Sequence, residues 1–165
     1  MAVYLFIIGE RDALHWVIHT SRVAFPPGRT TQARVLDAGD LLFLYTTRGA
    51  FHNPTRDRGR IAGRAVVLEP PQVFDDAMEL AGLRFASGCP IDIDLLAPYR
   101  GGAELVPLVH HMSATFGIGD GWRARMRATL VPVAEADAPV LEHAVSEHAG
   151  NPRDVLADYP RPSRV

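Results

Sequence analysis

The segment YTTRGAFHNPTRDRGR (residues 45–60) contains the residue types that a pocket for a planar, polar ring requires. Its aromatic side chains offer stacking faces, and its hydroxyl, amide and imidazole groups can hydrogen-bond to the edge of a base. These candidates for a base pocket are Tyr45, Thr46, Thr47, Phe51, His52 and Asn53. Its arginines could hold phosphates, and these candidates are Arg48, Arg56, Arg58 and Arg60. An arginine-rich hairpin loop has the same composition, so the residue types alone leave both interpretations open.

Histidines and the cysteine elsewhere in the chain give weaker signals. His15 and His19 are four residues apart on a predicted helix, a spacing that suits a metal, but the glutamate of the HExxH motif is missing. A general base at His110 or His111 has no serine or acid at a diagnostic spacing. Cys89 fits a small buried residue better than a nucleophile. We therefore predict no metal, no cofactor and no catalytic residue.

The composition is that of a single soluble domain. The chain has 165 residues, of which 47% are hydrophobic and 22% charged, with a net charge of −2. Such a balance lacks the global basic signature of a nonspecific nucleic-acid binder. Locally, however, residues 48–64 hold five arginines against Asp57 alone. All 17 basic residues are arginine, which suggests a GC-rich genome.

The cellular setting follows from two absences in the sequence. No apolar run approaches the ~20 residues that span a bilayer, and the N-terminus lacks the basic start of a signal peptide. A single cysteine excludes an internal disulfide framework and fits a reducing compartment. We expect a cytoplasmic protein that does not associate with a membrane.

Hydrophobic patterns and turn residues divide the chain into short elements. We expect strands at 3–9, 40–47, 61–70 and 129–134, extended segments at 72–75 and 90–96, and helices at 12–21, about 30–38, 106–115 and 136–149. Because the strands do not alternate regularly with helices, a mixed α+β barrel is favoured over a doubly wound sheet. Residues 150–165 are rich in Pro and Arg and are predicted to form a loose tail.

The order of several short motifs resembles the EVE domain of the PUA-like superfamily. VYLFIIG (3–9), TQAR (31–34) and AGDLLFLY (38–45) are similar to three successive segments of EVE domains of the thymocyte nuclear protein type, and IAGRAV (61–66) matches a later strand. The chain differs where Thr31 replaces a tyrosine and where Thr46 and Thr47 replace His-Ser. The insert at 49–60 is similar to a distinct bacterial subgroup.

The resemblance implies one PUA-like mixed β-barrel flanked by short helices over residues 1–149, related to YTH and ASCH domains. It places the pocket between the end of strand 3–9, the 25–34 segment and the 45–53 loop. Tyr45, Thr46 and Thr47 match the edge of the family's pocket, and Gln32 matches by motif. Aromatic type alone adds Trp16, Phe25, Phe51 and Trp122, for which core packing is the alternative role. Arg29 joins the phosphate-binding candidates.

The function that the resemblance implies is noncatalytic recognition of a modified nucleobase, with modified cytosine in DNA as one instance. The partner would be DNA or RNA that carries such a base, and the oligomeric state is left open. Two alternatives remain: an enzyme that acts on a nucleotide or nucleic acid through a histidine base, and a sensor of a small molecule.

Overall fold

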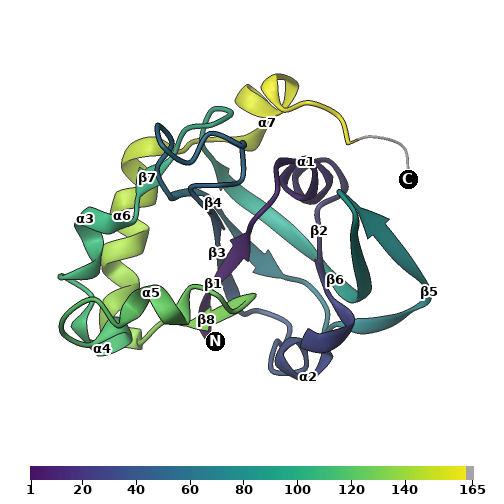
Figure 1. The fold of residues 1–165 in the computed structure, drawn as a ribbon, viewed down its shortest axis with the longest axis horizontal. Helices are drawn as coiled ribbons and strands as arrows, with labels where there is room; N and C mark the ends of the chain where they lie inside the picture. The colour runs from purple at the N-terminus through teal and green to yellow at the C-terminus, as the bar shows by residue number, and fades with distance from the viewer. Residues whose placement is uncertain (163–165) are drawn as a thin grey trace.

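A strongly curled eight-stranded sheet forms the centre of the fold (Figure 1). The structure is a computed structural model that describes residues 1–162. Its strands are β1 (Val3–Ile8), β2 (Arg22–Phe25), β3 (Leu41–Thr46), β4 (Arg60–Val67), β5 (Gln72–Leu80), β6 (Leu83–Leu96), β7 (Ala103–Glu104) and β8 (Leu130–Pro132). The order is β2-β6-β4-β3-β1-β8, with β5 paired to β6 and β7 to β4. The expected mixed barrel is therefore confirmed as a curled, half-barrel sheet.

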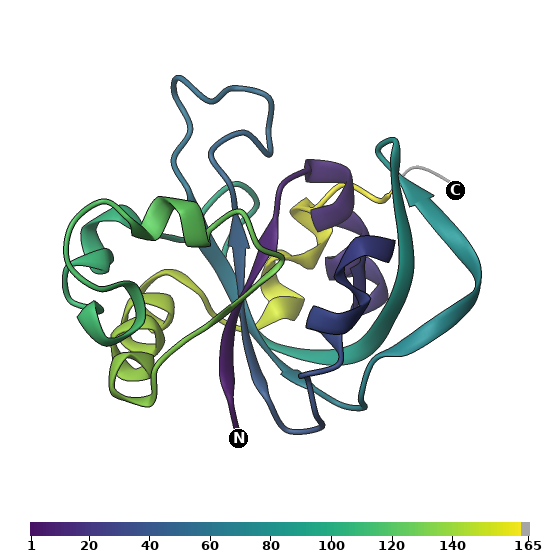
Figure 2. The ribbon, with the colours of Figure 1, turned by 60° about the horizontal axis from the view of Figure 1, so that its bottom comes forward.

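Short helices cover both faces of this sheet (Figure 2). The α-helices are α1 (Arg11–Thr20), α2 (Thr30–Ala33), α3 (Val106–Val109), α4 (Ser113–Phe116), α5 (Trp122–Arg125), α6 (Ala138–His148) and α7 (Pro152–Val155). Single 3-10 turns are η1 (Pro27–Arg29), η2 (Glu135–Asp137) and η3 (Leu156–Asp158). Helices α3 to α6 lie on one side, and α1, α2 and α7 on the other.

Two apolar clusters lie on opposite faces of the sheet. Along β1, Tyr4, Phe6 and Ile8 enter the cluster beneath α1, whereas Leu5 enters the cluster beneath α6, as the two-residue period of a strand requires. Strand β1 pairs in parallel with β3 and antiparallel with β8. Neighbours cover both faces and both edges of β1. For this reason its sequence is a nearly continuous apolar run.

Several element boundaries differ from those expected. The predicted helix 106–115 is interrupted, so that α3 and α4 are separate single turns. The extended segments at 72–75 and 90–96 belong to a longer hairpin of β5 and β6. Residues 47–59 contain no strand and connect β3 to β4, as the sequence predicts for the arginine loop.

The prediction of a loose tail is wrong for residues 150–162. Gly150 pairs with Leu96, and α7 and η3 follow. Tyr159 is only 2% exposed, and its hydroxyl donates a hydrogen bond of 2.8 Å to the carbonyl of Ala97. Burial of the Tyr159 ring thus orders a segment whose Pro- and Arg-rich composition predicts a loose tail. Residues 163–165 of the predicted tail lie outside the described residues.

Among residues 1–162, no helix has both the length and the apolar character needed to cross a membrane.

Candidate functional site

An apolar pocket of about 160 Å³ lies where β1 ends and α1 begins. Its walls come from the end of β1, from α1, from β2 and from the β5–β6 hairpin. The lining residues are Phe6, Ile7, Ile8, Gly9, Glu10, Ala13, Trp16, Val17, Ala24, Pro26, Leu80, Leu83, Phe85 and Thr129. An apolar cavity of about 150 Å³ accommodates benzene. The pocket therefore has room for one six-membered ring.

The β5–β6 hairpin supplies the outer wall of the pocket. Its turn consists of Ala81 and Gly82, both with positive φ (52° and 74°), which is the backbone that a tight two-residue hairpin requires. This turn pairs Leu80 with Leu83. Together with Phe85, these side chains pack toward Trp16 of α1. Two aromatic residues, Trp16 and Phe85, therefore line the pocket.

The inner edge of the pocket forms where two strands separate. Pairing of β1 with β8 ends at the hydrogen bond of 2.9 Å from the Ile7 amide to the Thr129 carbonyl. Beyond it, Gly9 borders the pocket instead of a neighbouring strand. Gln32 fixes the start of β8, since its side-chain carbonyl accepts from the amides of Thr129 and Leu130. The motif residue Gln32 thus positions the pocket edge and is not one of the lining residues.

Glu10 provides an ionisable side chain at the pocket. Its carboxylate oxygen Oε2 lies 3.0 Å from Nε2 of His52, which belongs to the loop 47–59. Both side chains remain partly exposed. The pair joins the loop to the rim of the pocket and leaves Glu10 able to accept a further hydrogen bond.

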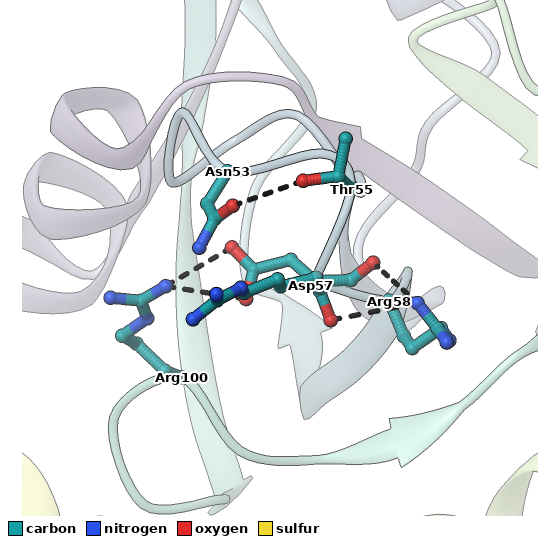
Figure 3. Close-up of polar contacts among 6 residues, drawn as sticks. Asn53, Thr55, Asp57, Arg58 and Arg100 are labelled. Carbon is teal, nitrogen blue, oxygen red and sulfur yellow. Dashed lines mark hydrogen bonds and ion pairs between the residues drawn. The ribbon is translucent and has the colours of Figure 1, made fainter.

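Arg100, in the turn between β6 and β7, holds the loop 47–59 in place (Figure 3). The Arg100 guanidinium donates to both carboxylate oxygens of Asp57, at 3.0 and 3.2 Å. It also lies 4.7 Å from the centre of the Phe51 ring, and Phe51 packs edge-to-face on Tyr99 at 5.6 Å. Asn53 accepts a long hydrogen bond from Thr55 within the loop. Phe51 and Asn53 therefore stabilise the loop and do not line the pocket.

Trp16 is the predicted stacking residue that lines the pocket. Phe25 is fully buried and packs edge-to-face on Phe6 at 5.6 Å. Trp122 is 6% exposed and packs on Phe116 in the opposite cluster. Phe25 and Trp122 therefore pack in the core. Core packing was the alternative role that the sequence left open for both.

Tyr45 and Thr46 end β3, Thr47 follows the strand, and none of the three lines the pocket. Tyr45 and Thr46 are buried, and the Thr46 hydroxyl donates to the carbonyl of Arg60 at 3.3 Å. Burial raises the pKa of the Tyr45 phenol, while Arg123 and Arg48 act in the opposite direction. The amide of Thr47 donates to the Ile8 carbonyl at 3.0 Å, which ties the start of the loop to β1.

The predicted phosphate-binding arginines divide into two groups. Arg60 is engaged, with Glu104 at 3.5 Å and the Gly102 carbonyl at 3.4 Å. Arg29, Arg48, Arg56 and Arg58 are exposed, and within residues 1–162 none of the four forms an ion pair. A role for these four in phosphate binding stays a prediction.

The histidine pair on α1 has protein partners. Nε2 of His15 lies 2.7 Å from the Tyr99 hydroxyl, and Nε2 of His19 lies 2.8 Å from the Tyr159 carbonyl. Burial lowers the pKa of His15, which favours its neutral form. In the described part of the chain, no three His, Cys, Asp or Glu residues are grouped to hold a metal.

Of the lining residues, the sequence predicted Trp16, and those it missed include Glu10, Leu80, Leu83 and Phe85. One signal was available for the hairpin, because Ala81-Gly82 between two leucines is a two-residue turn flanked by apolar positions. Glu10 had no comparable signal, since its place at the rim depends on how α1 leaves β1.

Comparison with known proteins identifies the architecture through structure alone. No family model and no curated protein matches the chain. The YTH domain of Mmi1, solved in complex with RNA, aligns over 91% of this chain and 83% of its own at 9% identity, with a TM-score of 0.59. A Pseudomonas putida protein aligns over 87% and 99% at 18% identity, with a TM-score of 0.57. Human THYN1, solved with DNA containing 5-methylcytosine, aligns over 87% and 98% at 12% identity, with a TM-score of 0.51.

The chain has a PUA-like fold. This confirms the fold that the resemblance to EVE domains implies. Because the alignments cover more than four-fifths of both chains, the PUA-like fold accounts for the sheet and most of its helices.

Proposed function

We propose that this PUA-like protein binds nucleic acid and holds one modified base, such as a modified cytosine, in the pocket at the end of β1. The observation that carries the proposal is the pocket itself: it has the volume of one ring, and Trp16 and Phe85 line it. Two proteins of the same fold were solved with RNA and with DNA containing 5-methylcytosine, which supports the assignment.

Stacking would supply the affinity for a base, and burial of a methyl group would supply the preference for a modified base. Flipping a base from a duplex costs roughly a few kcal/mol, and each stacking contact returns roughly 1–3 kcal/mol. Two aromatic residues, Trp16 and Phe85, can therefore offset that cost. An added methyl group on the base gains about 0.8 kcal/mol from burial against the apolar wall, or about a fourfold preference.

Glu10 would select the edge of the base. A carboxylate accepts a hydrogen bond from the exocyclic amino group of cytosine, whereas the carbonyl at the same position of thymine or uracil would face it with like polarity. The volume of the pocket favours one ring over two. Both arguments point to cytosine.

We further propose that the protein binds this base without catalysing a reaction. The polar side chains among the lining residues are Glu10 and Thr129, and the lining contains no serine, cysteine or histidine in the described part of the chain. Of the histidines considered as bases, His110 lines a different pocket beside α5. His52 stands at the rim in contact with Glu10.

The proposal is tested by titration with short single-stranded and duplex oligonucleotides. Each carries cytosine, 5-methylcytosine, 5-hydroxymethylcytosine or N6-methyladenine at one position, at two salt concentrations. Anisotropy of labelled DNA or RNA reports binding, and tryptophan fluorescence reports occupation of the pocket.

We expect binding that weakens with salt and that prefers a modified base. Glu10→Gln should reduce the preference for cytosine over uracil and leave the preference for the methyl group intact. Asp158→Asn, a neutralised acid on the exposed turn η3, is the control. Equal affinity for all modified and unmodified strands would refute base recognition.

A further inference from the structure

Three arginines outside the predicted phosphate-binding set occur at alternate positions in the segment DGWRARMRAT (120–129). Arg123, Arg125 and Arg127 are all exposed. The segment contains α5 and ends at Thr129, which lines the base pocket. The arginines therefore lie on the stretch of chain that leads directly to the pocket.

Buried contacts hold this segment in place. Trp122 is buried against Phe116, and the guanidinium of Arg123 lies 4.7 Å from the centre of the Trp122 ring. Arg125 donates a hydrogen bond to the Thr115 carbonyl. Arg125 is thus engaged in the structure, while the charges of Arg123 and Arg127 face solvent without a hydrogen-bond acceptor among residues 1–162.

The same segment lies near the base of the arginine loop. Trp122 of α5 and Tyr45 at the end of β3 belong to one apolar cluster, so α5 lies on the face of the sheet from which Arg48 and the loop begin. Gly59 packs against the Tyr45 phenol so closely that a Cβ at position 59 would overlap its hydroxyl oxygen. In Figure 2 the loop stands above α5.

Little negative charge opposes these arginines. Asp120 is the one acidic residue between 120 and 129. Within residues 1–162, neither Arg48, Arg123 nor Arg127 forms an ion pair. Guanidinium groups suit phosphate because they can donate two parallel hydrogen bonds to its oxygens.

We infer that Arg127, Arg123 and Arg48 form a phosphate-binding track, along which a nucleic-acid strand runs from the pocket at Thr129 past α5 to the loop 47–59. The inference rests on the proposed function, because a base held in the pocket fixes the point from which the strand runs along the track. The occupant is a phosphodiester backbone rather than an acidic protein, since the track is continuous with a pocket that accommodates a ring.

The test compares Arg123→Gln/Arg127→Gln with a control that makes the same change in net charge, Arg153→Gln/Arg161→Gln. The control arginines are exposed and belong to the C-terminal segment. Binding of a single-stranded oligonucleotide with one 5-methylcytosine is measured by anisotropy from low to moderate salt. Each phosphate contact contributes about 0.7 to the slope of log affinity against log salt for a single strand, so two lost contacts should make it shallower by about 1.4.

The inference predicts this change in the track variant and little change in the control, with the ratio of affinities for modified and unmodified strands unaltered in both. A track variant that binds like the unmodified protein would overturn the track while leaving base recognition intact. Equal weakening of the two variants would also overturn it, because the effect would then be one of net charge. Competition by a poly-glutamate peptide of equal charge would overturn the nucleic-acid occupant. A parent protein that binds no strand would instead refute the proposed function.

Discussion

Trp16 offers the sharpest test of the pocket. It is a half-buried side chain on α1 that forms the wall facing the hairpin residues Leu80 and Phe85. Trp16→Ala removes one stacking face, which is worth roughly 1–3 kcal/mol per base. We therefore expect binding of a strand with a modified base to weaken roughly 5- to 150-fold.

The change also affects stability, and this effect must be separated from binding. Truncation of a fully buried aromatic costs about 3–5 kcal/mol, and the partly exposed Trp16 should cost less. A domain of this size is stable by roughly 5–15 kcal/mol, so the variant should remain folded. Urea unfolding measured before each titration establishes this.

Two further variants complete the experiment. Trp16→Phe keeps an aromatic face and should retain most of the affinity. Trp122→Phe alters the buried tryptophan of the opposite cluster but keeps an aromatic ring beneath Arg123, so it should cost stability with little change in affinity, and it leaves Trp16 as the reporter of fluorescence. Anisotropy at constant salt gives the affinities. Unchanged affinity of folded Trp16→Ala, or an equal loss in Trp122→Phe, would refute the assignment of the pocket.

Other predictions concern the folded state. Tyr159→Ala should cost about 3–5 kcal/mol in urea unfolding, because the ring is buried and its hydroxyl bonds Ala97; a loss below about 1 kcal/mol would mean that the segment is loose. Since burial lowers the pKa of His15, the unfolded chain takes up a proton more readily than the folded chain as pH falls below about 6.5. The free energy of unfolding should decrease over that window, and His15→Phe, measured from pH 5 to 8, should show a weaker decrease; an identical profile would contradict this. Burial raises the pKa of the Cys89 thiol to about 11, so Ellman's reagent at pH 8 should label it only upon unfolding, and rapid labelling of native protein would exclude this account.

Local patterns sufficed to predict the centre of the sheet. The apolar run VYLFII became β1, and the segment that follows Asp40 became β3 because both strands are covered on both faces. The loop between β3 and β4 was predicted from its length and polarity. In each case the signal is contained within one short stretch of chain.

The sequence patterns could not predict contacts between segments that are distant along the chain. Strand β5 contains Asp75, Asp76 and Glu79 without clear alternation, so its pairing with β6 was not expected over its full length. Tyr159 stands alone in a Pro- and Arg-rich stretch, and nothing local indicates that it fills a site beside Tyr99. The pocket combines four such segments, which explains why Trp16 was identified and its opposite wall was not.

The position of β1 has a consequence for the order in which the chain assembles during synthesis. One edge of β1 pairs with β3, which is made soon afterwards, but the other edge pairs with residues 130–132 of β8. At ribosomal rates of about 5–20 residues per second, that second edge waits about 6–25 s for its partner. During this interval an apolar strand with unpaired backbone groups is open to pairing with other chains. A chaperone that binds extended apolar segments therefore has a target in β1 long before β8 is made.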